Sequence, residues 1–380
     1  MNDVDSAKDQ TGTTAGEALL AHFASAGYRR AEPAILQPAA VFLDQAGEDI
    51  RGRLYLTVDA AGAEMCLRPE YTVPVCREYL AGPLAGKAAN YSYFGPVFRL
   101  RPGADGEFLQ AGLESFGRKD REAADAEILS LALEAAESGG ARALDVEIGD
   151  AGLFNAFLAA LDLPAPWLRR LKRGLALGQP LETILTQPAG DDRQAGVLAA
   201  LEGADKNGAK ALVEDLLSIA GISSVGGRTA GEIAERFLEQ ASLRADGAPA
   251  EKRDLIARFL AQAGDPDGVS TRMRRLAKDA GLDLSAALDA FDKRLNFMAA
   301  RGLEPADMHF SASFARRLDY YTGFVFEARA KTAQGAREQD KPVIGGGRYD
   351  GLLASLGARQ DIPAVGAAIW IDRMTTGAAS

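Results

Sequence analysis

The stretch Glu107–Gly117, which reads EFLQAGLESFG, constrains the fold and chemistry of this chain more than any other. Side chains alternate between the two faces of a β-strand, so Gln110, Gly112 and Glu114 share one face. Glycine inside a strand is typical of a place where a ligand or another backbone comes close. We therefore expect a ligand to lie between the amide and the carboxylate. A solvated polar face with a glycine bulge is the alternative that this stretch leaves open.

Charge and composition exclude several classes of function. The chain has 380 residues and a formal charge of -10, with acidic and basic residues interspersed, which disfavours a surface that follows nucleic-acid phosphates. Cys66 and Cys76 form no CxxC pair and only two histidines are present, so we expect no metal site and no disulfide. The apolar runs are too short to span a bilayer, which predicts a cytoplasmic protein without membrane contact.

The pattern of apolar residues divides the chain into four parts and predicts an α+β fold. Residues 1–13 are polar and read as a disordered tail. Residues 14–163 and 304–380 mix alternating strand patterns with helical ones. Between them, residues 164–303 are rich in Ala, Leu and charged residues at helical spacing, which indicates an inserted helical domain. We interpret its charges as solvated helix faces.

Three further stretches carry polar residues beside predicted strands. Leu67–Thr72 reads LRPEYT, where Glu70 is either a helix-start residue that complements the helix dipole or part of a site. Arg316–Glu327 reads RRLDYYTGFVFE and precedes a strand. Gly345–Gly347 opens GGGRYDGL, which we interpret as a tightly packed glycine turn between a strand and a helix, because the spacings of phosphate-binding loops are absent.

Taken in order, these four stretches resemble the catalytic core of class II aminoacyl-tRNA synthetases, and specifically histidyl-tRNA synthetase. The matching segments are Leu67–Thr72, Phe98–Glu114, Arg316–Glu327 and Gly346–Leu352. The resemblance implies a mostly antiparallel sheet flanked by helices, with a helical insertion domain. Each match alone is weak, whereas four in the same order are specific.

The resemblance also assigns roles to single residues. It implies a histidine-binding site in which Glu70, Thr72 and Gln110 hold the α-ammonium, Glu114 and Tyr320 or Tyr321 face the imidazole, and Arg316 binds the carboxylate. An arginine fork suits a carboxylate, and an imidazole has nitrogens that need distinct donors and acceptors. Arg99 and Arg373 match the nucleotide-binding arginines of the family.

The departures from the synthetase pattern concern ATP and tRNA. The interval between Arg99 and Gln110 is shorter than in the synthetases, and Glu107 stands at a basic position. Trp370 replaces a small glycine beside the adenine, and Arg317 replaces another glycine. The chain ends at Ser380, soon after the last motif, so we expect no anticodon-binding domain and no tRNA partner.

A kept histidine pocket with altered ATP elements is similar to the family of ATP phosphoribosyltransferase regulatory subunits, which are paralogues of histidyl-tRNA synthetase. That resemblance implies a non-catalytic protein without catalytic residues or a cofactor. It would activate the short-form catalytic subunit of ATP phosphoribosyltransferase and bind histidine as an effector, as a homodimer within a hetero-octamer. Two alternatives stay open: a truncated enzyme that forms histidyl-adenylate, and a histidine sensor for another partner such as a kinase.

Overall fold

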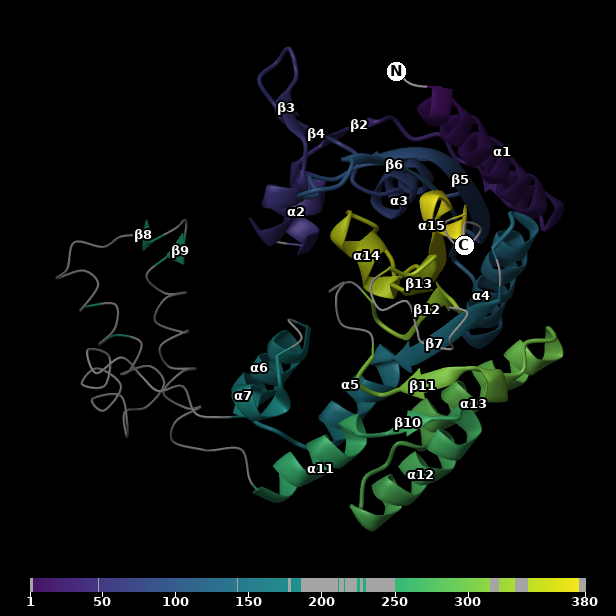
Figure 1. Ribbon diagram of the computed structural model, residues 1–380. Helices are drawn as coiled ribbons and strands as arrows, with labels where there is room; N and C mark the ends of the chain where they lie inside the picture. Colours follow the sequence, from purple (N-terminus) through teal and green to yellow (C-terminus); the bar gives the residue numbers. More distant parts are fainter. Residues whose placement is uncertain are drawn as a thin grey trace. The chain divides into compact units, whose positions relative to one another are not determined.

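The computed structural model describes residues 3–46, 48–141, 143–176, 179–185, 211, 215, 224–225, 228–229, 250–314, 321–331 and 341–375. The chain divides into two compact units (Figure 1). The first contains residues 1–157 and 260–380, and the second contains residues 158–259. None of the helices in the described part of the chain is long and apolar enough to cross a bilayer.

The first unit is built on a large mixed sheet. Its strand order is β1-β5-β6-β14-β13-β12-β7-β11-β10, and neighbouring strands run antiparallel except in the pairs β1–β5 and β7–β11, which are parallel. The strands are β1 (Arg29–Arg30), β5 (Ala89–Phe98), β6 (Glu107–Phe116), β7 (Leu144–Asp150), β10 (Ala263–Gly264), β11 (His309–Ser311), β12 (Phe324–Ala330), β13 (Ile344–Arg348) and β14 (Ala364–Trp370). The mostly antiparallel sheet expected from the motifs is confirmed.

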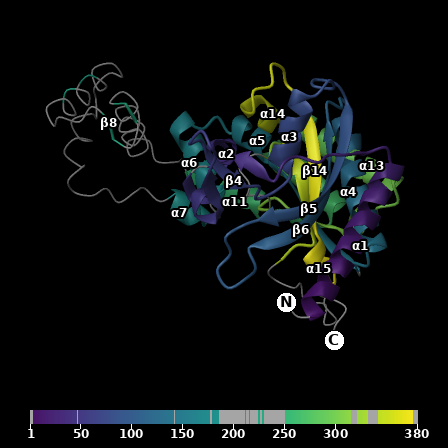
Figure 2. The same ribbon diagram turned by 90° about the horizontal axis from the view of Figure 1, so that it is seen from above.

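Helices cover both faces of this sheet, and a small second sheet lies beside it (Figures 1 and 2). One face contacts α1 (Asp3–Ser25) and α4 (Arg121–Ser138), and α13 (Ser285–Ala300) packs on α4. The opposite face carries α3 (Thr72–Ala81) and α14 (Asp350–Ser355). The small antiparallel sheet has the order β2-β4-β3, with strands β2 (Leu36–Pro38), β3 (Leu56–Val58) and β4 (Glu64–Leu67).

The remaining elements are short or lie at the edges of the two units. In the first unit they are α2 (Ala40–Ala46), η1 (Glu48–Arg53), α12 (Pro266–Asp279), η2 (Pro305–Asp307) and α15 (Ile371–Thr375). Helix α5 (Ala151–Ala160) begins in the first unit and ends in the second. The second unit holds α6 (Ala165–Ala176), α7 (Leu181–Leu185), β8 (Ser224–Val225), β9 (Arg228–Thr229) and most of α11 (Ala250–Leu260).

Residues 3–13, predicted as a disordered tail, are instead the first half of α1. The buried side of α1 runs through Gly12, Gly16, Leu19, Leu20 and Phe23, which is helical spacing. Phe94 lies so close to Gly16 that an added Cβ would be 2.1 Å from its ring. Within residues 12–25, the packing face of this helix therefore starts with two glycines, which disfavour helix in isolation and hid the pattern in the sequence.

The predicted insertion, residues 164–303, is longer than the second compact unit, because α12 and α13 belong to the first. A buried ion network explains this. The Arg294 guanidinium on α13 donates to Asp125 of α4 at 2.8 Å and to Asp150 of β7 at 2.7 Å. Arg348 of β13 donates to the other oxygen of Asp125 at 2.9 Å. All four side chains are buried, so α13 is tied to the sheet although its sequence resembles the insert.

We expect Arg294→Met to lower the free energy of unfolding by about 3–5 kcal/mol, because it leaves Asp125 and Asp150 buried without their shared cation. Urea denaturation measures the change. Arg275→Met is the matched control: Arg275 is 85% exposed, and its one ion pair among the described residues is with Asp279 at 3.8 Å, so the effect should stay within about 0.5 kcal/mol. Equal effects of the two substitutions would contradict a stabilising role for the network.

Candidate functional site

Strand β6 presents the predicted ligand-binding residues on one face, within an uninterrupted ladder. It pairs residue by residue with β5 from Glu107↔Phe98 to Phe116↔Ala89, and with β14 from Gln110↔Trp370 to Phe116↔Ala364. Opposite residues of an antiparallel pair share a face. The alternative of a glycine bulge is therefore wrong, and Gln110, Gly112 and Glu114 lie in a regular row.

The space above Gly112 is filled by a tyrosine. A Cβ added at Gly112 would lie 2.3 Å from Tyr93 Oη and 2.3 Å from the Ala367 carbonyl oxygen. Tyr93 faces Gly112 across β5 and β6, and its side chain is fully buried. Our expectation that the glycine leaves open backbone for a ligand is corrected: the glycine admits the Tyr93 ring, whose hydroxyl lies between the positions of Gln110 and Glu114.

Glu114 is a fully buried carboxyl group with partners on one side only. Tyr349 donates a hydrogen bond from its hydroxyl to Oε2, and the absence of a side chain at Gly366 leaves the space that Oε2 occupies. The other oxygen, Oε1, has no hydrogen-bond partner within the described residues. Burial raises the pKa of Glu114 to about 8, against hydrogen bonds that lower it. This carboxyl group can therefore donate a hydrogen bond from Oε1 while it is protonated, and can accept one or bind a cation once it is ionised.

Gln110 is 1% exposed and adds a second acceptor to the same face. Its Oε1 atom is buried and accepts no hydrogen bond from the part of the chain that the structure describes. A buried acceptor without a hydrogen-bond partner lowers the stability of the folded protein by about 1–3 kcal/mol. Two such oxygens, four residues apart on the same face of one strand, indicate a site for a polar ligand.

Glu70 and Thr72 reach the same site from the start of α3. The Glu70 carboxylate accepts the backbone N–H groups of Thr72 at 2.5 Å and Val73 at 2.9 Å, so its interpretation as a helix-start residue is confirmed. Burial raises the pKa of Glu70, while these N–H groups and the Arg99 charge lower it. The Thr72 hydroxyl lies close enough to Glu70, Glu114 and Tyr93 to lower the pKa of each of them. The structure therefore brings together the two residues predicted from LRPEYT with Glu114.

Arg99 and Arg373 are held by backbone carbonyl groups. Arg99 Nε donates to Pro69 O at 2.6 Å, and its guanidinium lies 5.6 Å from the Phe108 ring centroid. Arg373 Nη1 donates to Pro342 O at 2.7 Å, and its guanidinium lies 4.4 Å from the Trp370 ring centroid. Burial lowers the pKa of Arg373, and the nearby charge of Arg99 lowers it further.

Trp370 lies over the glycine-rich strand. A Cβ added at Gly345 would be 3.3 Å from the edge of the indole ring. The three glycines of β13 belong to a strand and not to the turn that we predicted. At Gly346 an added Cβ would lie 2.4 Å from the carbonyl oxygen of Gly366. Close packing against β14 therefore explains this glycine, which supports the packing interpretation over a phosphate cradle.

Of the residues predicted from RRLDYYTGFVFE, only Tyr321 can be placed. It is half-buried, packs against the apolar cluster on the α3 side of the sheet, and a Cβ at Gly347 would be 2.9 Å from its ring. Arg316 and Tyr320 lie outside the described residues. Their predicted contacts with the carboxylate and the imidazole remain predictions.

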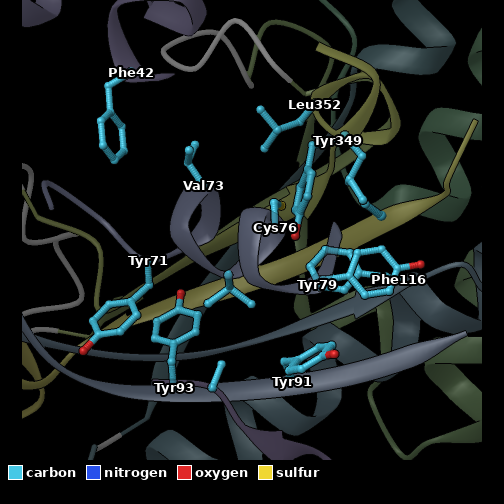
Figure 3. Close-up of a cluster of buried hydrophobic side chains, with 14 of the residues drawn as sticks. Phe42, Tyr71, Val73, Cys76, Tyr79, Tyr91, Tyr93, Phe116, Tyr349 and Leu352 are labelled. Atoms are coloured by element: carbon cyan, nitrogen blue, oxygen red, sulfur yellow. The ribbon is translucent and has the colours of Figure 1, made fainter. Parts of the chain in front are cut away.

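Tyr93 and Tyr349 are functional candidates that the sequence analysis missed. Figure 3 shows both among the buried side chains around α3, with the Tyr349 hydroxyl near Cys76. A signal for Tyr93 existed: it lies in the strand just before the ligand-binding one, at a position that antiparallel pairing sets opposite Gly112. Tyr349 gave no such signal, because its contact with Glu114 joins residues 235 positions apart.

Comparison with known proteins identifies relatives along almost the whole chain. The family model described as histidyl-tRNA synthetase matches residues 1–224 and 206–374. A protein of Mesorhizobium japonicum named ATP phosphoribosyltransferase regulatory subunit is 41% identical over 363 residues, which cover 93% of this chain and 94% of that protein. A protein of Brucella anthropi with the same name is 39% identical and covers 90% of each chain.

Solved structures share the fold at low sequence identity. A Bacillus halodurans protein, titled ATP phosphoribosyltransferase regulatory subunit/histidyl-tRNA synthetase, has a TM-score of 0.64 at 19% identity, covering 98% of this chain and 80% of that chain. Histidyl-tRNA synthetase from Nostoc has a TM-score of 0.63 at 17% identity, covering 97% and 71%.

The raised pKa of Glu114 predicts a pH-dependent stability difference. The folded protein keeps this carboxyl protonated up to about pH 8, whereas the unfolded chain loses the proton near 4.5. Stability from this group therefore falls as pH rises between those values, by about 1.4 kcal/mol per pH unit. We expect Glu114→Gln, which cannot ionise, to become more stable relative to wild type from pH 5 to pH 8. Urea denaturation at several pH values tests this, and a constant difference would contradict it.

Proposed function

The chain belongs to the histidyl-tRNA synthetase family, and within it to the ATP phosphoribosyltransferase regulatory subunits, and from that premise we propose that it regulates ATP phosphoribosyltransferase in histidine biosynthesis. In this proposal it activates the short-form catalytic subunit and carries the binding site for histidine, the feedback inhibitor. The main support for this proposal is the buried pair of Gln110 and Glu114, whose Oε1 atoms accept no hydrogen bond within the described residues.

Histidine matches the chemistry of this site. Its α-ammonium supplies three N–H donors, which suit the oxygens of Glu70, Thr72 and Gln110, and its imidazole suits Glu114. The half-buried ring of Tyr321 faces the same side of the sheet as these residues. The remaining predicted contacts are Tyr320 with the imidazole and Arg316 with the carboxylate. Because unpaired buried groups cost free energy, such a site rejects amino acids that lack a ring N–H.

Feedback inhibition then requires two states of the complex. Histidine shifts the equilibrium only by its difference in affinity for the active and the inhibited state. The site residues come from β6 and the start of α3, and Tyr349 joins β13 to α14. A ligand that contacts Glu114 could therefore shift β6 and α3 and, through Tyr349, β13 and α14 as well.

Two features support a regulatory and non-catalytic role. The Trp370 indole lies over Gly345, beside Arg373, where a flat ligand ring would otherwise stack. The loop between β5 and β6 is closed by the Arg99 N–H to Gly106 O hydrogen bond of 2.8 Å and by Arg101, which donates to Asp105 O at 2.9 Å. A short loop of this kind offers little surface to ATP or tRNA. In our proposal Arg99 and Arg373 are remnants of a nucleotide site.

For the assembly, we propose a synthetase-like homodimer within a hetero-octamer in the cytoplasm, with the catalytic subunit as the protein partner and no tRNA. This follows from the resemblance to the regulatory subunits. Failure of the chain to co-purify with a short-form catalytic subunit from the same cell would favour the alternative of a histidine sensor for another protein.

We expect Glu114→Ala and Arg316→Ala each to weaken histidine binding by about tenfold or more, about 1.4 kcal/mol, because each removes a charged or polar ligand contact. Isothermal titration calorimetry measures the affinity. Glu107→Ala is the matched control, since Glu107 lies on the same strand but is exposed at its far end. Unchanged affinity in both site variants would place the histidine site elsewhere.

The second candidate function is histidyl-adenylate formation, which the nearness of the Arg99 and Arg373 charges favours. The proposed regulatory role predicts no histidine-dependent exchange of pyrophosphate into ATP above the background without protein. The measurement uses the purified chain with a histidyl-tRNA synthetase as positive control. Exchange that persists in wild type and disappears in Arg373→Ala would replace our proposal with the enzymatic one.

A further inference from the structure

Tyr93 occupies the centre of the candidate site, although none of the sequence motifs includes it. Its hydroxyl lies over Gly112, midway along the row that Gln110 and Glu114 form on β6. Its pKa is raised well above 10 by burial and by the charges of Glu114 and Glu70. The hydroxyl therefore keeps its proton.

The hydrogen bond that Tyr93 donates leaves its oxygen able to accept another. The hydroxyl donates its proton toward the Ala367 carbonyl oxygen at 3.4 Å. A phenolic oxygen combines one donor with acceptor capacity. With the proton engaged by Ala367, this oxygen offers a ligand an acceptor and not a donor.

A stack of side chains fixes where the Tyr93 ring lies (Figure 3). Tyr71 is parallel to it, with ring centroids 4.4 Å apart and 7° between the planes. The Arg68 guanidinium lies 4.0 Å from the Tyr71 centroid on the far side of the stack from the site. Arg68 is itself held by Pro96 O at 2.9 Å and by Pro33 O at 2.7 Å, so the stack is anchored to backbone.

We propose that Tyr93 Oη is a further ligand contact, which accepts a hydrogen bond from the α-ammonium group of the bound amino acid. Tyr71 and Arg68 are positioning residues that hold the ring over Gly112. This contact rests on the proposed histidine site and adds to it. An ammonium group has three N–H donors. Glu70 and Thr72 would accept from it on the α3 side, and Gln110 and Tyr93 on the side of the sheet.

The competing explanation is that Tyr93 only fills the space above Gly112. Phenylalanine fills that space and stacks on Tyr71 equally well, so Tyr93→Phe separates the two explanations. The matched control is Tyr79→Phe: Tyr79 is fully buried in the same cluster, but its hydroxyl donates to Lys87 O at 2.8 Å, away from β6.

The experiment is calorimetric titration of wild type, Tyr93→Phe and Tyr79→Phe with two ligands, histidine and imidazolepropionate, which is histidine without its amino group. We expect Tyr93→Phe to weaken histidine binding by about tenfold, since a hydrogen bond to a charged group is lost. Its affinity for imidazolepropionate should stay within about twofold of wild type, and Tyr79→Phe should leave both affinities unchanged. Both ligands are measured on one preparation, so a partly unfolded fraction cancels from the ratio of dissociation constants.

Equal losses for both ligands in Tyr93→Phe, or no loss for histidine, would overturn the proposed contact while leaving the histidine site in place. Wild-type protein that binds neither ligand would contradict the proposed function, and the contact with it.

Discussion

The Asp125 carboxylate, fully buried between two guanidinium groups, is the interaction on which the architecture depends. One oxygen pairs with Arg294 of α13 and the other with Arg348 of β13, residues 169 and 223 positions away along the chain. Removing either cation would strand a charge in the core. The network therefore fixes α4 and β7, which precede the second unit in sequence, against α13 and β13, which follow it. Strand β13 contains the three glycines and is followed directly by Tyr349, which contacts Glu114.

In the candidate site, glycines leave space that larger side chains from neighbouring strands occupy. Gly112 admits Tyr93, Gly366 admits the Glu114 carboxyl group, and Gly345 lies under Trp370. The shape of the site thus comes from pairing across four neighbouring strands, β5, β6, β14 and β13. Two buried side-chain oxygens, Gln110 Oε1 and Glu114 Oε1, have no hydrogen-bond partner within the described part of the chain. Polar groups kept in the core without partners reduce stability, which is an expected cost of function.

Much of this arrangement was predictable from the sequence. Alternation in EFLQAGLESFG placed Gln110 and Glu114 on one face, and the order of four motifs predicted the mostly antiparallel sheet. Local patterns failed where long-range packing decides: α13 looks like its neighbours in the insert until Arg294 meets Asp125, and the glycines of α1 conceal a packing face. Tyr349 contacts Glu114 only through strand order, which periodicity does not reveal.

We propose that histidine bound at the Glu114 site lowers the activity of a partner enzyme. The most direct measurement is the activity of a short-form ATP phosphoribosyltransferase co-expressed with this chain, wild type or Glu114→Ala, with and without histidine. Our account predicts that both complexes are active, that histidine inhibits the wild-type complex, and that the Glu114→Ala complex is inhibited only at about tenfold higher histidine or more. Equal inhibition of both complexes, or no activation by either, would contradict it.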